Sequence, residues 1–206
     1  MAQLSGGQKK RAKESGVTLL YTPFAREAFV FIVNADNPVN SLTEQQVRDI
    51  FSGAITNWRT VGGNDQEIQT WQRPEDSGSQ TVMQSQVMKN VRMISPQETE
   101  VASVMEGMIK VVAEYRNTNN AIGYTFRYYA TQMNADKNIK LLAINGITPT
   151  AENIRNGKYA YIVDAFMVTI ENTTSETQKL VEWFLTPQGQ SPVEDVEYVP
   201  LYKTLH

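Results

Sequence analysis

The residues best suited to chemistry in this chain lie between Arg73 and Ser79. Arg73-Pro74-Glu75-Asp76 follows an apolar stretch, and three small residues come next, Ser77, Gly78 and Ser79. The apolar residues that follow at helical spacing predict a helix beginning at this point: Val82, Met83 and Val87. The first amides of a helix are unpaired and its dipole is positive there, so such an end favours an anion. Two hydroxyls and a nearby arginine would add strong donors.

A simpler interpretation of the same residues stays open. Ser77 or Ser79 would then be an ordinary N-cap, and Arg73 a solvated surface charge. The local pattern alone does not separate an anion site from a plain helix start.

Catalytic and metal-binding chemistry find little support in the sequence. There is no cysteine, and the sole histidine is the final residue, His206, so thiolate nucleophiles, Ser-His-Asp triads and His/Cys metal clusters are not expected. The carboxylates of Glu75 and Asp76 diverge because they are adjacent, which favours solvated loop charges over an acid–base pair. We therefore expect a protein that is not an enzyme and that uses no cofactor and no metal.

Three tyrosines have a functional and a structural interpretation. Tyr124, Tyr128 and Tyr129 could stack on a ligand, but packing in the core and at the rim of a strand is favoured.

Residues 4–8, LSGGQ, spell the signature motif of ABC-transporter ATPases. That motif acts together with a G-x-x-x-x-G-K-[ST] loop, which this chain lacks, so nucleotide hydrolysis is not expected.

The length and the net charge of the chain limit the remaining functional classes. The chain has 206 residues, enough for one domain or for two small lobes with cores of their own. With 19 basic and 22 acidic residues the formal charge is −3, which argues against a nucleic-acid-binding face but not against one small anion. No apolar run approaches the length of a membrane span, and residues 1–13 lack the apolar stretch of a signal peptide.

Local signals predict the elements around the candidate site. Thr43 with Gln46 forms a capping box, and Gly53 ends the short helix that follows. Residues 17–21 and 28–33 are expected to be strands, the second buried on both faces. The other expected elements are a helix at 98–115, strands at 122–129 and 139–144, a short helix or turn at 153–158, an extended return segment at 159–170, and a last long helix at 175–185 with Leu180, Val181 and Phe184 inward.

A longer pattern carries a family resemblance. Residues 37–58, NPVNSLTEQQVRDIFSGAITNW, are followed by a glycine turn, an apolar strand and the arginine-to-serine run described above. Further matching segments follow in order at 121–124, 141–146, 149–150 and 185–190. Together they closely resemble the phosphate-binding proteins of bacterial ABC importers, in the branch common in Gram-positive bacteria. The resemblance extends from about Gly16 to Tyr202.

The resemblance implies an α/β, periplasmic-binding-protein-like (type II) fold, in which two lobes close on the ligand at a hinge. Residues 40–160 would form the complete second lobe with the anion-site loop, and 1–39 with 161–206 an incomplete first lobe, because the family's first strand–helix unit has no counterpart here. The segment 34–38 would be one crossing between the lobes. An incomplete lobe leaves strand edges uncovered, so a homodimer through that lobe is expected.

The resemblance maps phosphate onto five residues: Arg73, Glu75, Ser77, Gly78 and Ser79. Arg73 would supply charge and N–H donors, the two serines would supply hydroxyls, and the amides of the helix start would face a cleft. Glu75 would accept a hydrogen bond from protonated phosphate and so select against sulfate. Asp76 stands where many relatives have glycine and adds negative charge.

The implied function is the solute-binding component of an ABC phosphate importer, or a fragment of it. Such a protein would bind inorganic phosphate outside the cytoplasm, at the cell surface or in the periplasm, and present it to an ABC permease. No nucleic-acid partner is expected. The alternative is a sensory or protein-interaction module of the same fold with weak or no ligand binding, because part of the family's donor set is absent.

Overall fold

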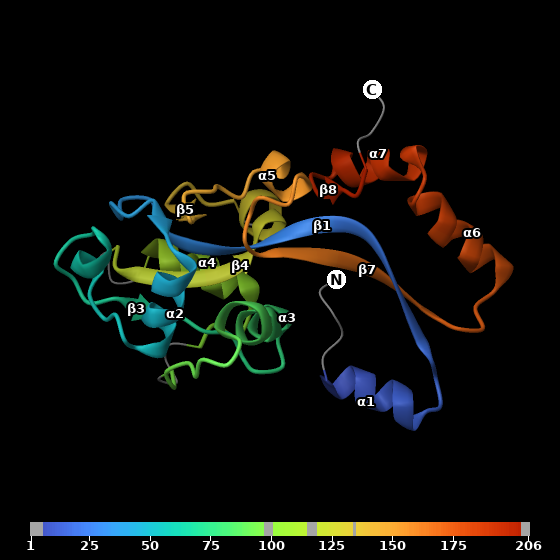
Figure 1. The fold of residues 1–206 in the computed structure, drawn as a ribbon, viewed down its shortest axis with the longest axis horizontal. Helices are drawn as coiled ribbons and strands as arrows, with labels where there is room; N and C mark the ends of the chain where they lie inside the picture. The colour runs from blue at the N-terminus through green and yellow to red at the C-terminus, as the bar shows by residue number, and fades with distance from the viewer. Residues whose placement is uncertain (1–5, 97–100, 115–118, 134, 203–206) are drawn as a thin grey trace.

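The computed structural model describes residues 6–96, 101–114, 119–133 and 135–202. Within them, two long strands, β1 (Leu19–Asn34) and β7 (Ile162–Ile170), lead from an α/β body into an extended arm (Figure 1). The arm carries α1 (Gly6–Glu14) at one end and α6 (Ser175–Phe184) with α7 (Pro187–Asp195) at the other.

The body holds most of the remaining elements. In chain order they are β2 (Ser41–Leu42), α2 (Glu44–Ser52), the 3-10 helix η1 (Trp58–Val61), β3 (Gln69–Thr70), α3 (Gly78–Val82), the π-helix η2 (Met83–Met88), α4 (Met105–Glu114), β4 (Ala121–Phe126), the π-helix η5 (Tyr129–Met133), β5 (Ile139–Leu141), β6 (Ala143–Ile144) and α5 (Ala151–Arg155). The last strand, β8 (Val199–Pro200), follows α7 and pairs with β1.

Strand β1 belongs to both parts of the molecule. Residues 29–33 pair antiparallel with β4, and residues 32–34 pair antiparallel with β5. Strand β3 extends this sheet by pairing in parallel with β4. Residues 19–28 of β1 instead pair with β7, with a register shift between Pro23 and Ala25. The passage from body to arm therefore lies inside β1.

The crossing predicted at residues 34–38 is wrong. Asn34 ends β1 within the body, and the side-chain amide of Asn37 donates to the carbonyl of Asn119 at 3.1 Å. One continuous strand of 16 residues replaces the two strands predicted at 17–21 and 28–33. The polar residues between the two apolar runs did not end the strand because they found partners: Arg26 donates to the carbonyl of Arg155 at 2.9 Å. The division of the chain into two lobes stays a prediction, and this pairing favours a boundary inside β1.

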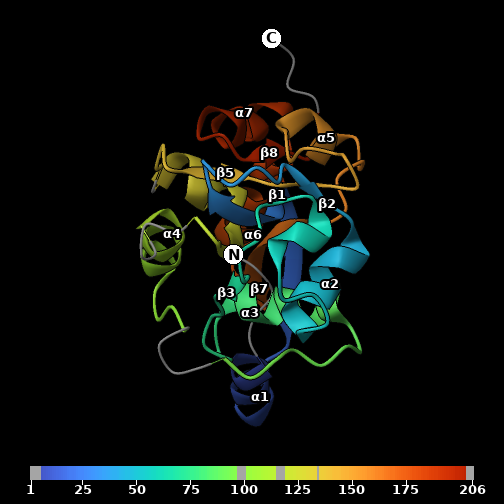
Figure 2. The ribbon, with the colours of Figure 1, turned by 90° about the vertical axis from the view of Figure 1, so that its left-hand side faces the viewer.

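The core of the body lies on both faces of β1 and β4. The side chains at 28–33 have no exposed surface, so the prediction of a strand buried on both faces is confirmed. Helices α2 and α4 lie on opposite sides of the sheet (Figure 2). On the α4 side, a Cβ at Gly123 would come within 2.4 Å of the Met108 sulfur. On the α2 side, the rings of Phe31 and Phe51 lie 5.9 Å apart. Each such apolar side chain contributes about 1.5–3 kcal/mol on burial.

The cap signals in the sequence are confirmed. The Thr43 hydroxyl accepts from the Gln46 amide, and the Gln46 side chain accepts from the Thr43 amide, which completes the capping box of α2. Gly53 ends α2 with φ of 81°, a conformation that glycine adopts without steric cost. These contacts fix the helix that leads into the site-bearing half of the body.

The inward face predicted for the helix at 175–185 is wrong. The helix forms as α6, but none of its residues is buried, and Leu180 and Trp183 are 55% and 41% exposed. The helical spacing of its apolar residues was correctly identified. Phe184 is half-buried and its ring lies 5.9 Å from that of Phe24 in β1, so this face is covered only in part.

The other elements are of the predicted type, but they begin or end at residues other than those predicted. Strand β4 ends at Phe126, and the chain then turns into η5 instead of remaining extended to Tyr129. The extended return segment is confirmed as β7. The helix predicted at 98–115 falls partly outside the described residues, and its described part is helical from Met105 to Glu114. No described helix has the length and apolar character that crossing a membrane requires.

Candidate functional site

A helix begins where the sequence predicted one. Ser77 is the N-cap of α3, and its hydroxyl accepts the amide of Gln80 at 3.2 Å. The helix continues into η2, and the predicted apolar face of Val82, Met83 and Val87 is buried, together with Met88. This burial anchors the helix against the sheet, so the position of its first turn is set by the core of the body.

Arg73 lies on the segment that joins β3 to α3, and it is not a solvated surface charge. It is only 9% exposed, and its Nη1 donates to the carbonyl of Ala102. Its Nε is buried without a hydrogen-bond partner, and no carboxylate in the described chain forms an ion pair with it. Burial lowers the pKa of Arg73 from its ordinary value, although the group stays a cation. A buried cation without an anion is costly.

The other predicted site residues lie at the start of α3 with differing exposure. Ser79 is buried, Ser77 is half-buried, and their hydroxyl oxygens are 3.5 Å apart. Gly78 and Glu75 are exposed. The two serines are thus brought together, and Gln80 links them to Arg73 through the bonds described below. The cleft that these amides were expected to face stays a prediction.

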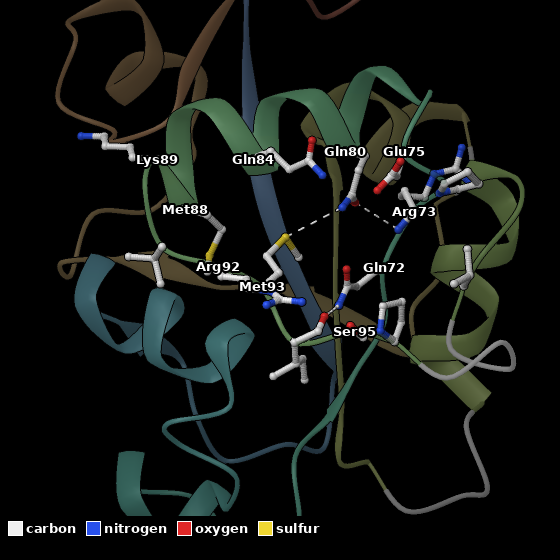
Figure 3. A pocket seen from close by; sticks show the side chains of 15 residues that line it. Gln72, Arg73, Glu75, Gln80, Gln84, Met88, Lys89, Arg92, Met93 and Ser95 are labelled. Carbon is white, nitrogen blue, oxygen red and sulfur yellow. Dashed lines mark hydrogen bonds between the residues drawn. The ribbon is translucent and has the colours of Figure 1, made fainter.

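A cavity of about 620 Å³ lies under the helix, between α3–η2 and the segment 91–96 (Figure 3). Arg73 and Glu75 line one end of it, and Lys89 and Arg92 line the other. Two glutamine contacts cross it: Gln72 donates to the Ile94 carbonyl at 2.8 Å, and Gln80 to the Met93 sulfur at 3.8 Å. Ser77, Gly78 and Ser79 do not line this cavity, so it shares Arg73 and Glu75 with the predicted anion site but does not include the first residues of the helix.

Gln80 was not predicted as a site residue, and for Tyr124 a packing role was favoured over stacking on a ligand. Gln80 is 3% exposed, and its Oε1 accepts from the Tyr124 hydroxyl and, at 3.3 Å, from the Arg73 amide. Tyr124 has no exposed surface, which confirms its place in the core. The signal that could have revealed Gln80 is its spacing: a polar residue three positions after the N-cap, on the helix face that Met83 and Val87 share.

The described residues contain no group of three or more His, Cys, Asp or Glu side chains that could hold a metal ion. The donors at the start of α3 are hydroxyls and backbone amides, and the Arg73 guanidinium, on the preceding segment, donates to the Ala102 carbonyl. Donors of this kind bind anions, whereas metal ions need lone-pair ligands.

The fold and this donor set define a class: a two-lobe, periplasmic-binding-protein-like α/β protein. A family model described as "PBP superfamily domain" matches residues 3–188, and the chain belongs to that superfamily.

Comparison with curated proteins gives relatives of one kind. The chain is 26% identical over 177 residues to the phosphate-binding protein PstS of Borreliella burgdorferi, covering 84% of this chain and 63% of that protein. It is 28% identical over 170 residues to PstS of Bacillus subtilis, covering 82% of this chain and 53% of that protein. The chain therefore spans a little more than half the length of these relatives.

Solved structures give the same class. A putative phosphate ABC transporter substrate-binding protein from Clostridium perfringens, solved with bound phosphate, superposes with a TM-score of 0.76 at 25% identity. The match covers 98% of this chain and 77% of that one. An ABC-type phosphate transport receptor from Vibrio cholerae gives a TM-score of 0.71 at 25% identity, covering 88% and 72%.

Proposed function

We propose that this chain binds inorganic phosphate as the solute-binding component, or a part of it, of an ABC-type uptake system. In the full-length protein it would act outside the cytoplasm and present phosphate to an ABC permease. The observation that carries the proposal is Arg73, a buried cation that leads into a capped helix start and has no carboxylate partner within the described chain. The similarity to phosphate-binding proteins, one of them solved with bound phosphate, supports the same ligand.

The proposed site uses five residues in separate roles: Arg73, Glu75, Ser77, Gly78 and Ser79. Arg73 supplies charge and its unpartnered Nε–H. The serine hydroxyls and the first amides of α3 donate to the phosphate oxygens. Glu75, which is exposed, accepts a hydrogen bond from the P–OH group of protonated phosphate and repels sulfate. In this proposal residues 40–160, together with the part of β1 that pairs in the body, form the lobe that carries these groups, and residues 1–28 with 161–206 contribute the opposite side.

Calorimetric titration of this chain with phosphate and with sulfate tests the proposal. Arg73→Ala should abolish measurable phosphate binding, because a charge-assisted hydrogen bond contributes about 1.5–3 kcal/mol and Arg73 offers several donors. Arg59→Ala is the matched control: Arg59 is an exposed arginine whose ion pair with Asp65 measures 2.9 Å. The proposal fails if the wild-type chain gives no heat with phosphate, or if Arg73→Ala binds as tightly as wild type.

The alternative, a sensory or protein-interaction module, is favoured by one observation on the arm. The surface formed by residues 19–24 of β1, residues 166–170 of β7 and α6, here called the arm face, exposes several large apolar side chains: Leu20, Tyr21, Ile170, Leu180 and Trp183. Large exposed apolar side chains of this kind are typical of an interaction site. This function predicts association through the arm face without a phosphate-dependent response.

We propose that the arm face pairs with a second copy of the chain. The argument rests on the strand edges, since within the described residues β7 pairs only with β1, and residues 19–23 pair only with β7. Neither 19–24 nor 166–170 contains a charged residue, so no like charges oppose pairing between identical edges. The buried stretch 28–33 does not contribute an uncovered edge to this dimer, because residues 29–33 pair with β4 and residues 32–34 with β5.

Light scattering on the chain at tens of micromolar tests the proposed pairing of two copies. We expect the mass of a dimer, and we expect Leu180→Glu to shift it to a monomer because a charge would enter the apolar contact. Val91→Glu is the control, since Val91 is 41% exposed but lies on the body. A monomeric wild-type chain, or a dimer that both substitutions leave intact, contradicts the proposal.

A further inference from the structure

Three buried groups from three different elements meet behind the start of α3. The Tyr124 hydroxyl of β4 donates to Oε1 of Gln80 in α3. The backbone amide of Arg73 points at both, at 3.1 Å from the tyrosine oxygen and 3.3 Å from the glutamine oxygen. Figure 3 draws the Gln80 contact between the helix and the segment that carries Arg73.

Gln80 also holds the helix cap. Its backbone amide donates to the Ser77 hydroxyl at 3.2 Å, while the Ser77 amide donates to the Pro74 carbonyl at 2.9 Å. Gln80 therefore holds the segment 73–80 at two points. Its side chain accepts from the Arg73 amide, and its main-chain amide donates to the Ser77 hydroxyl. Gln80 lies in α3 and Tyr124 in β4, and both elements are fixed in the core. The backbone of Arg73 therefore has one position in which its amide reaches these two acceptors.

We infer that Gln80 and Tyr124 are positioning residues of the phosphate site, which hold Arg73 and the first turn of α3 in the arrangement that receives the anion. This inference rests on the proposed function. Neither side chain would touch phosphate. Both act through the Arg73 backbone, because a displacement there moves the guanidinium relative to the amides of Gly78 and Ser79. Sites of this kind depend on a supporting layer of hydrogen bonds that fixes the binding groups.

The substitution Tyr124→Phe removes one hydroxyl and leaves the ring packing in place. It withdraws one acceptor from the Arg73 amide and the donor from Gln80 Oε1. We expect phosphate binding to weaken by up to about tenfold, since a buried hydrogen bond contributes roughly 1 kcal/mol. Amide hydrogen exchange should accelerate at Arg73 and Gln80. Gln80→Leu should weaken binding similarly, and the double variant should weaken it no further than the worse single one, because the two side chains act as a unit.

Tyr159→Phe is the matched control. Tyr159 is also buried, at 2% exposure, and its hydroxyl donates to the Phe29 carbonyl at 3.3 Å, a residue outside this cluster. This variant should lose stability as Tyr124→Phe does, yet bind phosphate like wild type. Affinities are compared where every variant is fully folded, so a purely structural role would leave them equal.

The outcomes separate the two proposals. If wild type binds phosphate and Tyr124→Phe binds it equally well, the positioning role is overturned while the proposed function stands. The positioning role also fails if Tyr159→Phe weakens binding as much as Tyr124→Phe does. A wild-type chain that does not respond to phosphate overturns the proposed function, and the inference that rests on it.

Discussion

The pH dependence of stability should be governed by one carboxyl, that of Glu27. Glu27 lies in β1 at the passage from body to arm and is 5% exposed. Its two oxygens accept the amides of Ala28 at 2.7 Å and Tyr128 at 3.1 Å. Burial raises the pKa of Glu27 from 4.5 to about 7, because desolvation outweighs those two hydrogen bonds and the charge of Arg127.

The sign and the size of the effect follow from this pKa. Below pH 4.5 the carboxyl is protonated in the folded and unfolded states alike, and it costs nothing. As the pH rises, the unfolded chain ionises first, so the folded state loses stability until the pH passes the folded pKa of about 7. One pKa unit corresponds to about 1.4 kcal/mol, so the whole loss is about 3 kcal/mol.

Urea unfolding of wild type and Glu27→Gln from about pH 4 to about pH 8 measures this loss. A glutamine cannot ionise, and its amide leaves one of the two backbone amides without an acceptor, which is a cost that does not vary with pH. The free energy of unfolding of wild type should therefore fall by about 3 kcal/mol relative to the variant across this range. The nearby Tyr198 hydroxyl, whose pKa burial and Glu27 raise, stays neutral in both proteins. A constant difference between the two proteins at every pH would refute the reasoning.

Three further substitutions test the packing and the capping that stabilise the elements. Gly189→Ala should lower the free energy of unfolding by about 1–3 kcal/mol or more, because the new Cβ would lie 2.0 Å from the Trp183 carbonyl oxygen at the junction of α6 and α7. Gly107→Ala in α4 should instead be neutral or stabilising by up to about 1 kcal/mol, since its Cβ would meet only Val104 at 3.6 Å. Thr43→Ala should cost about 1 kcal/mol by removing the α2 cap, with thermal unfolding as the measurement for all three.

The elements that could be predicted from the sequence are those whose signals are local. The capping box of Thr43, the glycine stop at Gly53 and the helix start at Ser77 depend only on residues within one turn, and all three were found where predicted. The burial of 28–33 could be predicted because a continuous apolar run needs cover on both faces.

The errors arose where pairing between distant segments decides the outcome. Residues 22–27 are polar enough to suggest a break, yet β7 lies 140 or so residues away and supplies the hydrogen bonds that keep β1 extended. The prediction of an inward face for α6 was wrong because the spacing of its apolar residues indicates an amphipathic helix but does not say whether another element covers that helix. Gln80 was missed because its partners, Arg73 and Tyr124, come together only in the fold.

The proposed anion site and the arm face are structurally independent of each other. The core that anchors the site includes Trp71, Val82, Met83 and Tyr124, and it contains no residue of α6 or α7. Covering or uncovering the arm therefore leaves the arrangement of Arg73 and the start of α3 unchanged. In the proposed function, the arm would contribute the opposite side of the phosphate site. Weak phosphate binding by this chain, abolished by Arg73→Ala, would thus indicate a complete donor set on the body and a missing opposite wall, rather than a damaged site.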